Sequence, residues 1–392
     1  PDYYEFCNST KIVSGSHALE HIGYELAALG AQRPLVLTNK QLLELKVATL
    51  VLDALADTEA EVVAVYDDVP VDSSVAVVND VARVFREKGA DAIVAVGGGS
   101  VLDTAKGATI VLTHGATDLM EYRGAESLTG RRSVVFIAIP TTAGTGSEVT
   151  SAAVIKDTER HVKMGFTSLS LLPDVAMLDP RLTVGLPPRL TASTAMDALT
   201  HAVEAFSCVQ ANPLSDCYAR AAIGLVVEHL PGVLDNPKDA CGRLALANAA
   251  LMAGAAFSNA MVGIVHAMGH AAGGVADVPH GEAMAILLPH GMAYNLDAVG
   301  DRYGELLLEL AGAEVYAATP AAERGAAAIE RVRSFSRMLH ERAGLPLTLT
   351  EAGVLPEHLS DIATAALNDG AMSMNPKQPT YEELVEILKG AL

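Results

Sequence analysis

The chain has 392 residues, of which 50% are hydrophobic and 19% are charged, which argues against a disordered or fibrous protein. With 27 Lys and Arg against 47 Asp and Glu, the net charge is −20, which argues against binding to nucleic acids or to anionic membranes. The four cysteines form no CxxC pair and the sequence does not begin with a basic region and an apolar run, so we expect a cytoplasmic protein without a signal peptide.

Helical and strand-like segments alternate in the first part of the chain. Apolar residues at helical spacing predict helices over residues 17–29, 42–55 and 75–89. Short apolar runs predict strands over residues 35–38, 62–66, 92–96 and 134–139. Continuous apolar strands separated by helices are typical of a parallel sheet that is covered on both faces.

The pattern changes near Pro187 and Pro188, after which strand-like runs nearly vanish and Ala-rich helical segments follow. We therefore predict an α/β domain over residues 1–187 and an all-helical domain over residues 188–392. Residues 244–276 contain no Asp, Glu, Lys or Arg, as a membrane span would. Asn, Ser and His interrupt this run, so a buried helix pair in a protein without a membrane partner is the better interpretation.

A glycine-rich turn, Gly97-Gly98-Gly99-Ser100, lies between a predicted strand and a helix that begins near Val101. Glycines there let backbone amides approach a phosphate, and a helix N-terminus favours negative charge. A tight turn with a capping box is the alternative, because the turn is neither a GxGxxG motif nor a P-loop. A second turn, residues 141–147, follows the strand at 134–139 and reads Thr-Thr-Ala-Gly-Thr-Gly-Ser. Two such turns at strand ends of one sheet favour a nucleotide ligand.

Histidines and one aspartate form a pattern typical of a metal site in the helical domain. Asp197 and His201 are four residues apart, as are His266 and His270, so each pair lies on one helix face. His280 follows in a Pro-His-Gly segment. One Asp oxygen and three imidazoles suit Fe or Zn with a position left open for substrate. The spacing does not decide which histidines ligate, and a satisfied core histidine is the alternative for each.

Taken together, these motifs resemble the iron-containing (group III) alcohol dehydrogenase family. The resemblance extends over essentially the whole chain. The matching segments are residues 97–103, 140–148, 197–204, 263–270, 279–281, 288–291 and 369–376. Membership would imply a dehydroquinate synthase-like fold, with an N-terminal nucleotide-binding α/β domain and an all-α C-terminal metal-binding domain.

The resemblance also implies roles for individual residues. The implied metal ligands are Asp197, His201, His266 and His280, while His270 would lie beside the metal as a catalytic residue. The implied cofactor-binding residues are Asn39, Gly98, Gly99, Ser100, Asp103, Thr141, Thr142, Thr145 and Lys163. Asn39 stands where many members have Asp, so NAD is the expected cofactor and NADP is the alternative.

The reaction that these parts predict is hydride transfer between a small aliphatic alcohol or aldehyde and NAD(H), with Fe2+ favoured over Zn2+ as the metal. Two other functions stay open: a lyase or synthase of the dehydroquinate synthase type, and a metallohydrolase. Glu204, three residues after His201, is either a partner of a metal ligand or a surface charge. The aromatic segment Tyr3-Tyr4-Glu5-Phe6 suggests a homodimer or higher homo-oligomer, because aromatic residues are enriched at interfaces.

Overall fold

The computed structural model describes residues 3–123, 128, 130, 132–158 and 162–392. The chain divides into two compact units. Residues Cys7–Gly185 form an α/β unit, and Leu186–Leu392 together with residues 3–6 form a helical unit.

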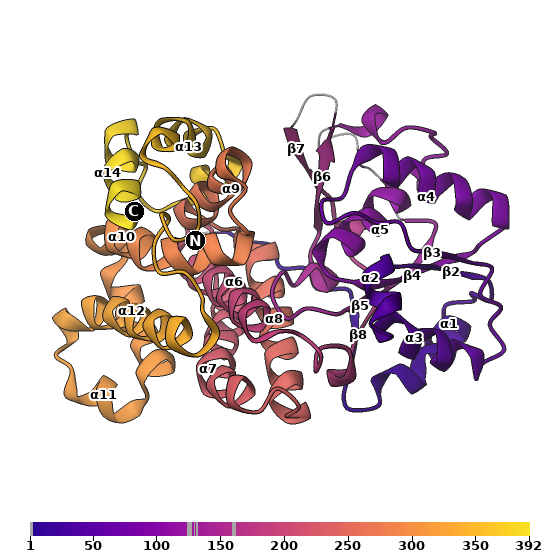
Figure 1. The fold of residues 1–392 in the computed structure, drawn as a ribbon, viewed down its shortest axis with the longest axis horizontal. Coiled ribbons are helices and arrows are strands. Elements are labelled where there is room, and N and C mark those ends of the chain that lie inside the picture. The colour runs from indigo at the N-terminus through magenta and orange to yellow at the C-terminus, as the bar shows by residue number, and fades with distance from the viewer. Residues whose placement is uncertain (1–2, 124–127, 129, 131, 159–161) are drawn as a thin grey trace. The chain divides into compact units, whose positions relative to one another are not determined.

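The α/β unit is built on a six-stranded parallel sheet (Figure 1). Its strand order is β1-β8-β5-β4-β2-β3. The strands are β1 (Lys11–Ser14), β2 (Pro34–Leu37), β3 (Ala64–Tyr66), β4 (Ala92–Gly97), β5 (Val135–Pro140) and β8 (Val175–Leu178). An antiparallel hairpin, β6 (Ala152–Asp157) and β7 (Val162–Thr167), forms a second small sheet.

Helices cover both faces of the six-stranded sheet. Side chains alternate between the two faces along each strand, so each strand packs against helices on both sides. Val36, Val94 and Ile137 are partners on neighbouring strands and pack in one apolar cluster with α1 (Ile22–Ala28) and α3 (Val47–Ala56). Their sequence neighbours face the other way and pack with α4 (Val75–Lys88) and α5 (Gly99–Thr113). These neighbours are Leu35, Ile93 and Phe136. The uninterrupted apolar strands therefore reflect burial on both sides, as the sequence predicted.

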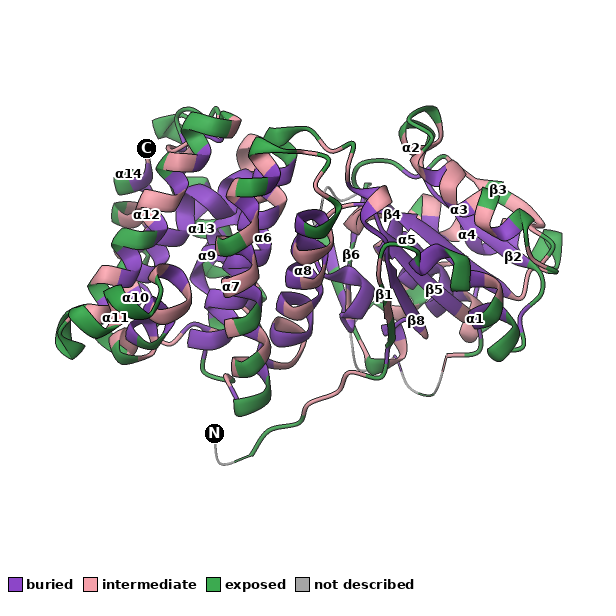
Figure 2. Ribbon diagram, turned by 90° about the horizontal axis from the view of Figure 1, so that it is seen from below, coloured by how far each residue is buried: buried purple, intermediate pink, exposed green. Residues whose placement is uncertain are grey.

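The helical unit surrounds α6 (Pro188–Ser207), in which every residue from Ala195 to Ser207 is buried (Figure 2). Helices α7, α8 and α10 all pack against α6. The other helices of this unit are α7 (Pro213–Asp235), α8 (Ala240–Ala260), α9 (Ile264–Ala276), α10 (His280–Ala311), α11 (Ala313–Ala318), α12 (Arg324–Ala343), α13 (Leu359–Leu367) and α14 (Tyr381–Ala391). Polar groups on α6 are thus enclosed on all sides, which makes that helix a suitable support for a buried site.

The charge-free run of residues 244–276 forms two helices, α8 and α9, as predicted. In the described part of the chain, α8 is the one helix that is long and apolar enough to cross a membrane. However, 61% of its most apolar window is buried inside the molecule, as in the core helix of a folded domain. The packing of α8 against α6 and α7 accounts for its apolar composition.

The fold class predicted from the sequence is confirmed: a parallel α/β unit precedes an all-helical one. One predicted element is wrong in detail. Residues 42–55 do not form a single helix, because the chain breaks at Lys46 between α2 (Lys40–Glu44) and α3. Lys46 adopts a left-handed conformation with φ of 60°, which interrupts helical hydrogen bonding.

Candidate functional site

The glycine-rich turn joins β4 to α5 at the carboxyl end of the sheet. Gly98 is the N-cap of α5 and Gly99 its first residue. A Cβ on Gly98 would lie 3.3 Å from Oγ1 of Thr142, and one on Gly99 would lie 3.1 Å from Cγ2 of Thr145. The two predicted turns are therefore neighbours, packed so closely that side chains would crowd them. Exposed amides at the N-terminus of a 15-residue helix beside threonine hydroxyls suit a pyrophosphate.

Ser100 and Thr141 support this turn in different ways. The Ser100 hydroxyl donates a hydrogen bond to the carbonyl of Val71. The amide of Thr141, a buried residue, donates to the carbonyl of Gly97 at 3.1 Å and so ties the end of β5 to the end of β4. The backbone of the two turns is thus fixed by contacts within the α/β unit.

Asp103 is directed into the α/β unit and fixes the second turn. Its carboxylate accepts hydrogen bonds from the Ser147 hydroxyl at 2.8 Å and from the amide of Val154 at 2.9 Å. The ammonium of Lys106, which is fully buried, donates to hydroxyls of Ser147 and Thr150, each at 2.9 Å. These contacts give Asp103 a structural role next to the cofactor role that the resemblance implies.

Two further predicted cofactor residues lie near the same sheet edge and have protein partners. Asn39 follows β2 and caps α2, because its Oδ1 accepts the amide of Leu42 at 2.9 Å. Lys163 on β7 donates from Nζ to Oδ1 of Asp72 at 3.0 Å, and both side chains are largely exposed. The Lys163–Asp72 contact had no signal in the sequence pattern, whereas Asn before a helical segment is a common N-cap.

The predicted metal ligands converge in the helical unit. Asp197 and His201 come from α6, His266 and His270 from α9, and His280 begins α10. Oδ1 of Asp197 lies 3.2 Å from Nε2 of His280 and 3.7 Å from both Nε2 of His266 and Nδ1 of His201. The four groups therefore face one small volume.

The residues fit a divalent cation. In the described part of the chain, Oδ1 of Asp197, Nδ1 of His201 and Nε2 of His266 are buried and have no hydrogen-bond partner. The ligand atoms of these three residues all lie within 4.8 Å of one another. Leaving three buried polar atoms unsatisfied is costly. A bound cation would satisfy all three at once, and a carboxylate with imidazoles is a donor set that Fe2+ and Zn2+ accept.

Electrostatics in the cluster favour the ligating forms of two residues. Burial opposes ionisation of Asp197, but His201 and His280 hold the pKa of this carboxyl well below its usual range. Burial lowers the pKa of His201 to about 3, so its imidazole is neutral. Burial also disfavours the charged form of His266, but the nearby carboxylates of Asp197 and Glu204 outweigh this and raise its pKa. Positive charge is thus favoured in this volume.

Glu204 is buried beside His266, a predicted metal ligand, so it is not the surface charge that the sequence left as an alternative. Its Oε2 lies 2.6 Å from Nδ1 of His266, so the other ring nitrogen of His266 faces Asp197. Carboxylates commonly hold a ligating imidazole in this way. His270 has a similar partner, since its Nδ1 lies 2.9 Å from Oδ2 of Asp369. The Asp369 contact was not foreseen, because 99 residues separate the two.

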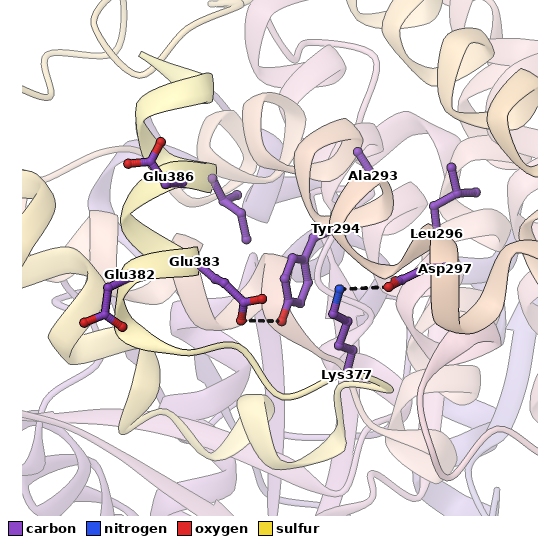
Figure 3. Close-up of a pocket in the computed structure, with 9 residues that line it drawn as sticks. Ala293, Tyr294, Leu296, Asp297, Lys377, Glu382, Glu383 and Glu386 are labelled. Carbon is purple, nitrogen blue, oxygen red and sulfur yellow. Dashed lines mark hydrogen bonds and ion pairs between the residues drawn. The ribbon is translucent and has the colours of Figure 1, made fainter.

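A separate hollow of about 710 Å3 lies between α10 and α14 (Figure 3). It contains none of the residues that the sequence assigned to a metal or a cofactor. Its lining residues are Ala293, Tyr294, Leu296, Asp297, Lys377, Glu382, Glu383, Glu386 and Ile387. The predicted metal and cofactor residues therefore do not line this hollow.

Comparison with known proteins identifies the family. Residues 9–180 match the family model described as iron-containing alcohol dehydrogenase, and residues 191–392 match the C-terminal domain of the Fe-containing alcohol dehydrogenase family. The chain is 36% identical over 386 residues to the NAD-dependent methanol dehydrogenase of Bacillus methanolicus, with 97% of each chain covered. It is 39% identical over 381 residues to the 1,3-propanediol dehydrogenase of Klebsiella pneumoniae, with 96% of each covered.

The structure agrees with this assignment. A crystal structure of 1,3-propanediol oxidoreductase superimposes with a TM-score of 0.94 at 36% identity, and all of both chains is covered. The resemblance inferred from the motifs is therefore confirmed, and the dehydrogenase relatives favour that activity over the synthase and hydrolase alternatives. The chain belongs to the iron-containing alcohol dehydrogenase family, and it is a metal-dependent oxidoreductase.

Proposed function

We propose that this enzyme transfers hydride reversibly between a small aliphatic alcohol or aldehyde and NAD(H), with Fe2+ favoured over Zn2+ as the metal. The observation that carries the proposal is the set of three buried, unpartnered ligand atoms that surround one volume in the helical unit. Burying such a set in a folded core without a cation would be costly.

The assignment of roles follows the residues predicted from the sequence. Asp197, His201, His266 and His280 would hold the metal. When bound, this ion supplies a Lewis acid that polarises the substrate oxygen and lowers the pKa of an alcohol. Glu204 holds the imidazole of His266 so that its free nitrogen faces the other ligands. The four ligands come from three helices, which fixes their separation before any ion is bound.

His270 is the residue that would exchange a proton with solvent. Its Nδ1 is engaged by Asp369, so the neutral ring carries its proton on Nδ1 and accepts at Nε2. The side chain is 43% exposed, about as much as that of His280 at 40%, and can therefore reach water. These features suit a proton carrier.

The α/β unit would bind the dinucleotide. Gly98, Gly99 and Ser100 would receive the pyrophosphate at the start of α5, with Thr141, Thr142 and Thr145 beside it and Asp103 behind the second turn. Lys163 would lie near the nicotinamide ribose, and Asn39 would bind the adenosine ribose. NAD is favoured because a relative is named NAD-dependent methanol dehydrogenase, while the uncharged Asn39 keeps NADP as the alternative.

The substrate class rests on two observations. The relatives named above act on methanol and on 1,3-propanediol, which are both small and aliphatic. Aromatic residues make up only 4% of the chain, which gives little scope for a cage around a ring substrate. We further propose that residues 1–187 serve the dinucleotide and residues 188–392 the metal, and that the enzyme is a cytoplasmic homodimer or higher homo-oligomer. No disulfide joins the four cysteines, all of which lie in described parts of the chain.

A panel of short-chain alcohols, each incubated with the purified enzyme and NAD, tests the function. The absorbance of reduced nicotinamide should rise with at least one of them, and removal of the metal with a chelator should stop the reaction. A synthase would leave no net reduced nicotinamide, and a metallohydrolase would turn over without any nicotinamide. Accumulation of reduced cofactor therefore separates the three functions.

A further inference from the structure

Helix α9, which carries His266, begins without a cap of its own. Its N-cap residue is Gly263, which has no side chain to accept the unsatisfied amides of the first turn. Two distant side chains perform this task. Oδ1 of Asn375 accepts the amide of Ile264 at 3.2 Å, and Glu204 accepts the next two amides at 2.7 and 3.3 Å.

Asn375 is itself held rigidly in the interior. It is 2% exposed, and it forms a reciprocal amide pair with Asn295 on α10, which is 3% exposed. Nδ2 of Asn295 donates to Oδ1 of Asn375 at 2.9 Å, and Nδ2 of Asn375 donates to Oδ1 of Asn295 at 2.8 Å. Asn375 also donates from Nδ2 to the carbonyl of Lys377 at 2.5 Å. Both lone-pair and both donor positions of the Asn375 amide are therefore in use.

The segment that carries Asn375 is anchored on α10 by a further pair of contacts (Figure 3). Nζ of Lys377 lies 3.0 Å from Oδ2 of Asp297 and 4.4 Å from the ring centroid of Tyr294. Farther along the same helix α9, Asp369 contacts His270. Residues 369–377 thus touch α9 at its first turn and again nearly two turns later, and they also contact α10.

The approach of Asn375 to α9 is close enough to transmit a displacement. A Cβ built on Gly263 would lie 2.8 Å from Oδ1 of Asn375 and 3.2 Å from Oε1 of Glu204. Only glycine leaves room for both acceptors at this point. A shift of either acceptor would therefore move the first turn of α9, in which His266 is the third residue.

We infer that Asn375 is a positioning residue for the metal site: its amide fixes the first turn of α9 and so places the imidazole of His266. The inference rests on the proposed ligand set. Asn375 acts through the backbone of α9 and does not touch the ligand atoms. Its removal should therefore weaken metal binding more than loss of one buried capping bond elsewhere.

The test measures Co2+ binding to the 392-residue chain after its metal has been stripped, in competition with a chelator of known affinity. Asn375→Ala should weaken Co2+ binding by about tenfold or more, the lower end of the range for partners of metal ligands, and should shift the visible Co2+ spectrum. Asn295→Ala, which loosens Asn375 but leaves the Ile264 bond, should give a smaller loss. Wild-type affinity and spectrum in Asn375→Ala would overturn the inference.

Asn212→Ala is the matched control, because Asn212 is buried and caps α7, and its side-chain hydrogen bonds go to Ser215, Gln210 and Asn259. Asn212→Ala should lower stability to urea but leave Co2+ affinity unchanged. If it lost as much Co2+ affinity as Asn375→Ala does, the effect of Asn375 would be a general contribution to folding and not a specific effect on the metal site. If Asn375→Ala does not fold, Asn295→Ala decides by the same readout. His266→Ala distinguishes a wrong ligand set from a wrong role for Asn375. Retained Co2+ in His266→Ala would mean that the ligand set is wrong. Lost Co2+ in His266→Ala together with unchanged binding in Asn375→Ala would refute only the positioning role of Asn375.

Discussion

Asp197 is the residue around which the predicted metal ligands are arranged, since the nearest nitrogens of three histidines lie within 3.7 Å of its Oδ1. Among the described residues, His270 differs from these three because its ring nitrogens make no such contact with Asp197, and its Nδ1 contacts Asp369 instead. Spacing alone could not separate His266 from His270, which share a helix face. Both imidazoles have a carboxylate at Nδ1, and what separates them is that Nε2 of His266 lies 3.7 Å from Asp197.

This difference predicts distinct effects of three substitutions. His266→Ala and His280→Ala should abolish metal retention, because each removes a ligand from a four-residue set. His270→Ala should keep the metal and slow turnover by about 100-fold, the smaller end of the usual effect of an acid–base group. Metal analysis of the purified variants with steady-state kinetics checks both statements. Loss of metal in His270→Ala as complete as in the other two would mean that His270 is a ligand.

A second prediction at this scale concerns Asn39. Asp caps a helix about as well as Asn, so Asn39→Asp should preserve the cap of α2 and the fold. A carboxylate there would face the 2′-phosphate of NADP, and such like-charge contacts cost several kcal/mol. The ratio of kcat/KM for NAD to that for NADP should therefore rise by about tenfold or more. An unchanged ratio would show that Asn39 does not lie at the ribose.

The predicted metal ligands on α6 and α9 could be named from the sequence because helical spacing places i and i+4 on one face. The residues that support them could not. For Glu204 the sequence left two roles open, and it assigned no role to Asn375 or Asn295. Asn375 lies 111 residues from the amide that it accepts, so its function depends on tertiary packing that no local pattern encodes. Gly263 carries a faint signal, because a glycine at a helix start allows close approach of another group.

At the scale of elements, α5 and the turn after β5 are joined through buried charged groups. Lys106 on α5 donates to two hydroxyls of this turn, and Glu148 is buried beside them. Burial lowers the pKa of Lys106 to about 8 and raises the pKa of Glu148 to about 7. The contacts that fix this turn, which would line the cofactor, therefore require Lys106 and Glu148 to be buried, and burial disfavours the charged form of each.

Glu148→Gln is expected to change the pH dependence of stability. The folded carboxyl, with a pKa of about 7 against an ordinary 4.5, binds its proton more tightly than the unfolded chain does. This residue therefore makes the protein less stable as pH rises through that window. Glutamine removes the titration, so the free energy of unfolding of the variant relative to wild type should increase with pH, by up to about 3 kcal/mol.

Urea unfolding of both proteins at about pH 5 and about pH 8 measures this effect, since the two conditions bracket most of the window. The substitution leaves the packing nearly unchanged, because Gln and Glu have nearly the same shape. A difference between the two proteins that is the same at both pH values would contradict the prediction.

Element boundaries show where local patterns are sufficient and where they are not. Strands β4 and β5 were predicted within one residue of each end, because burial on both faces makes them continuously apolar. The break at Lys46 was missed, because neither Gly nor Pro marks it. Strand β1 was also missed: it is only four residues long, and three of them are exposed, so it has no apolar run.

At the scale of the whole molecule, the fold class followed from the change in pattern near residue 187. Alternating elements indicated a parallel sheet, and the Ala-rich second half indicated helices. The sequence did not indicate how the strands are ordered, because order depends on which helices cross which face. Strand β1, first in the chain, pairs with β8, the last strand of the same sheet.

Assembly is the last property of the whole molecule that can be tested. We expect a homodimer as the smallest unit, since two-fold dimers are the commonest symmetric assembly. The charge of −20 does not oppose this, because repulsion is screened beyond about 10 Å at about 0.1 M salt. In light scattering, about twice the chain mass of 40.7 kDa would support a dimer, and a mass near 40.7 kDa would exclude it.

The aromatic segment at residues 3–6 is the candidate contact within such a dimer. Phe6 stacks on Tyr218 of α7 with ring centroids 5.7 Å apart, so its side chain packs within the subunit. Tyr3 and Tyr4 are 75% and 42% exposed within the single chain, and tyrosine is a residue that interfaces favour. Deletion of residues 1–6 should therefore shift the light-scattering mass toward the monomer. Replacing Tyr3 and Tyr4 by Ser while keeping Phe6 separates contact between subunits from packing on α7, and an unchanged mass in both variants would place the dimer contact elsewhere.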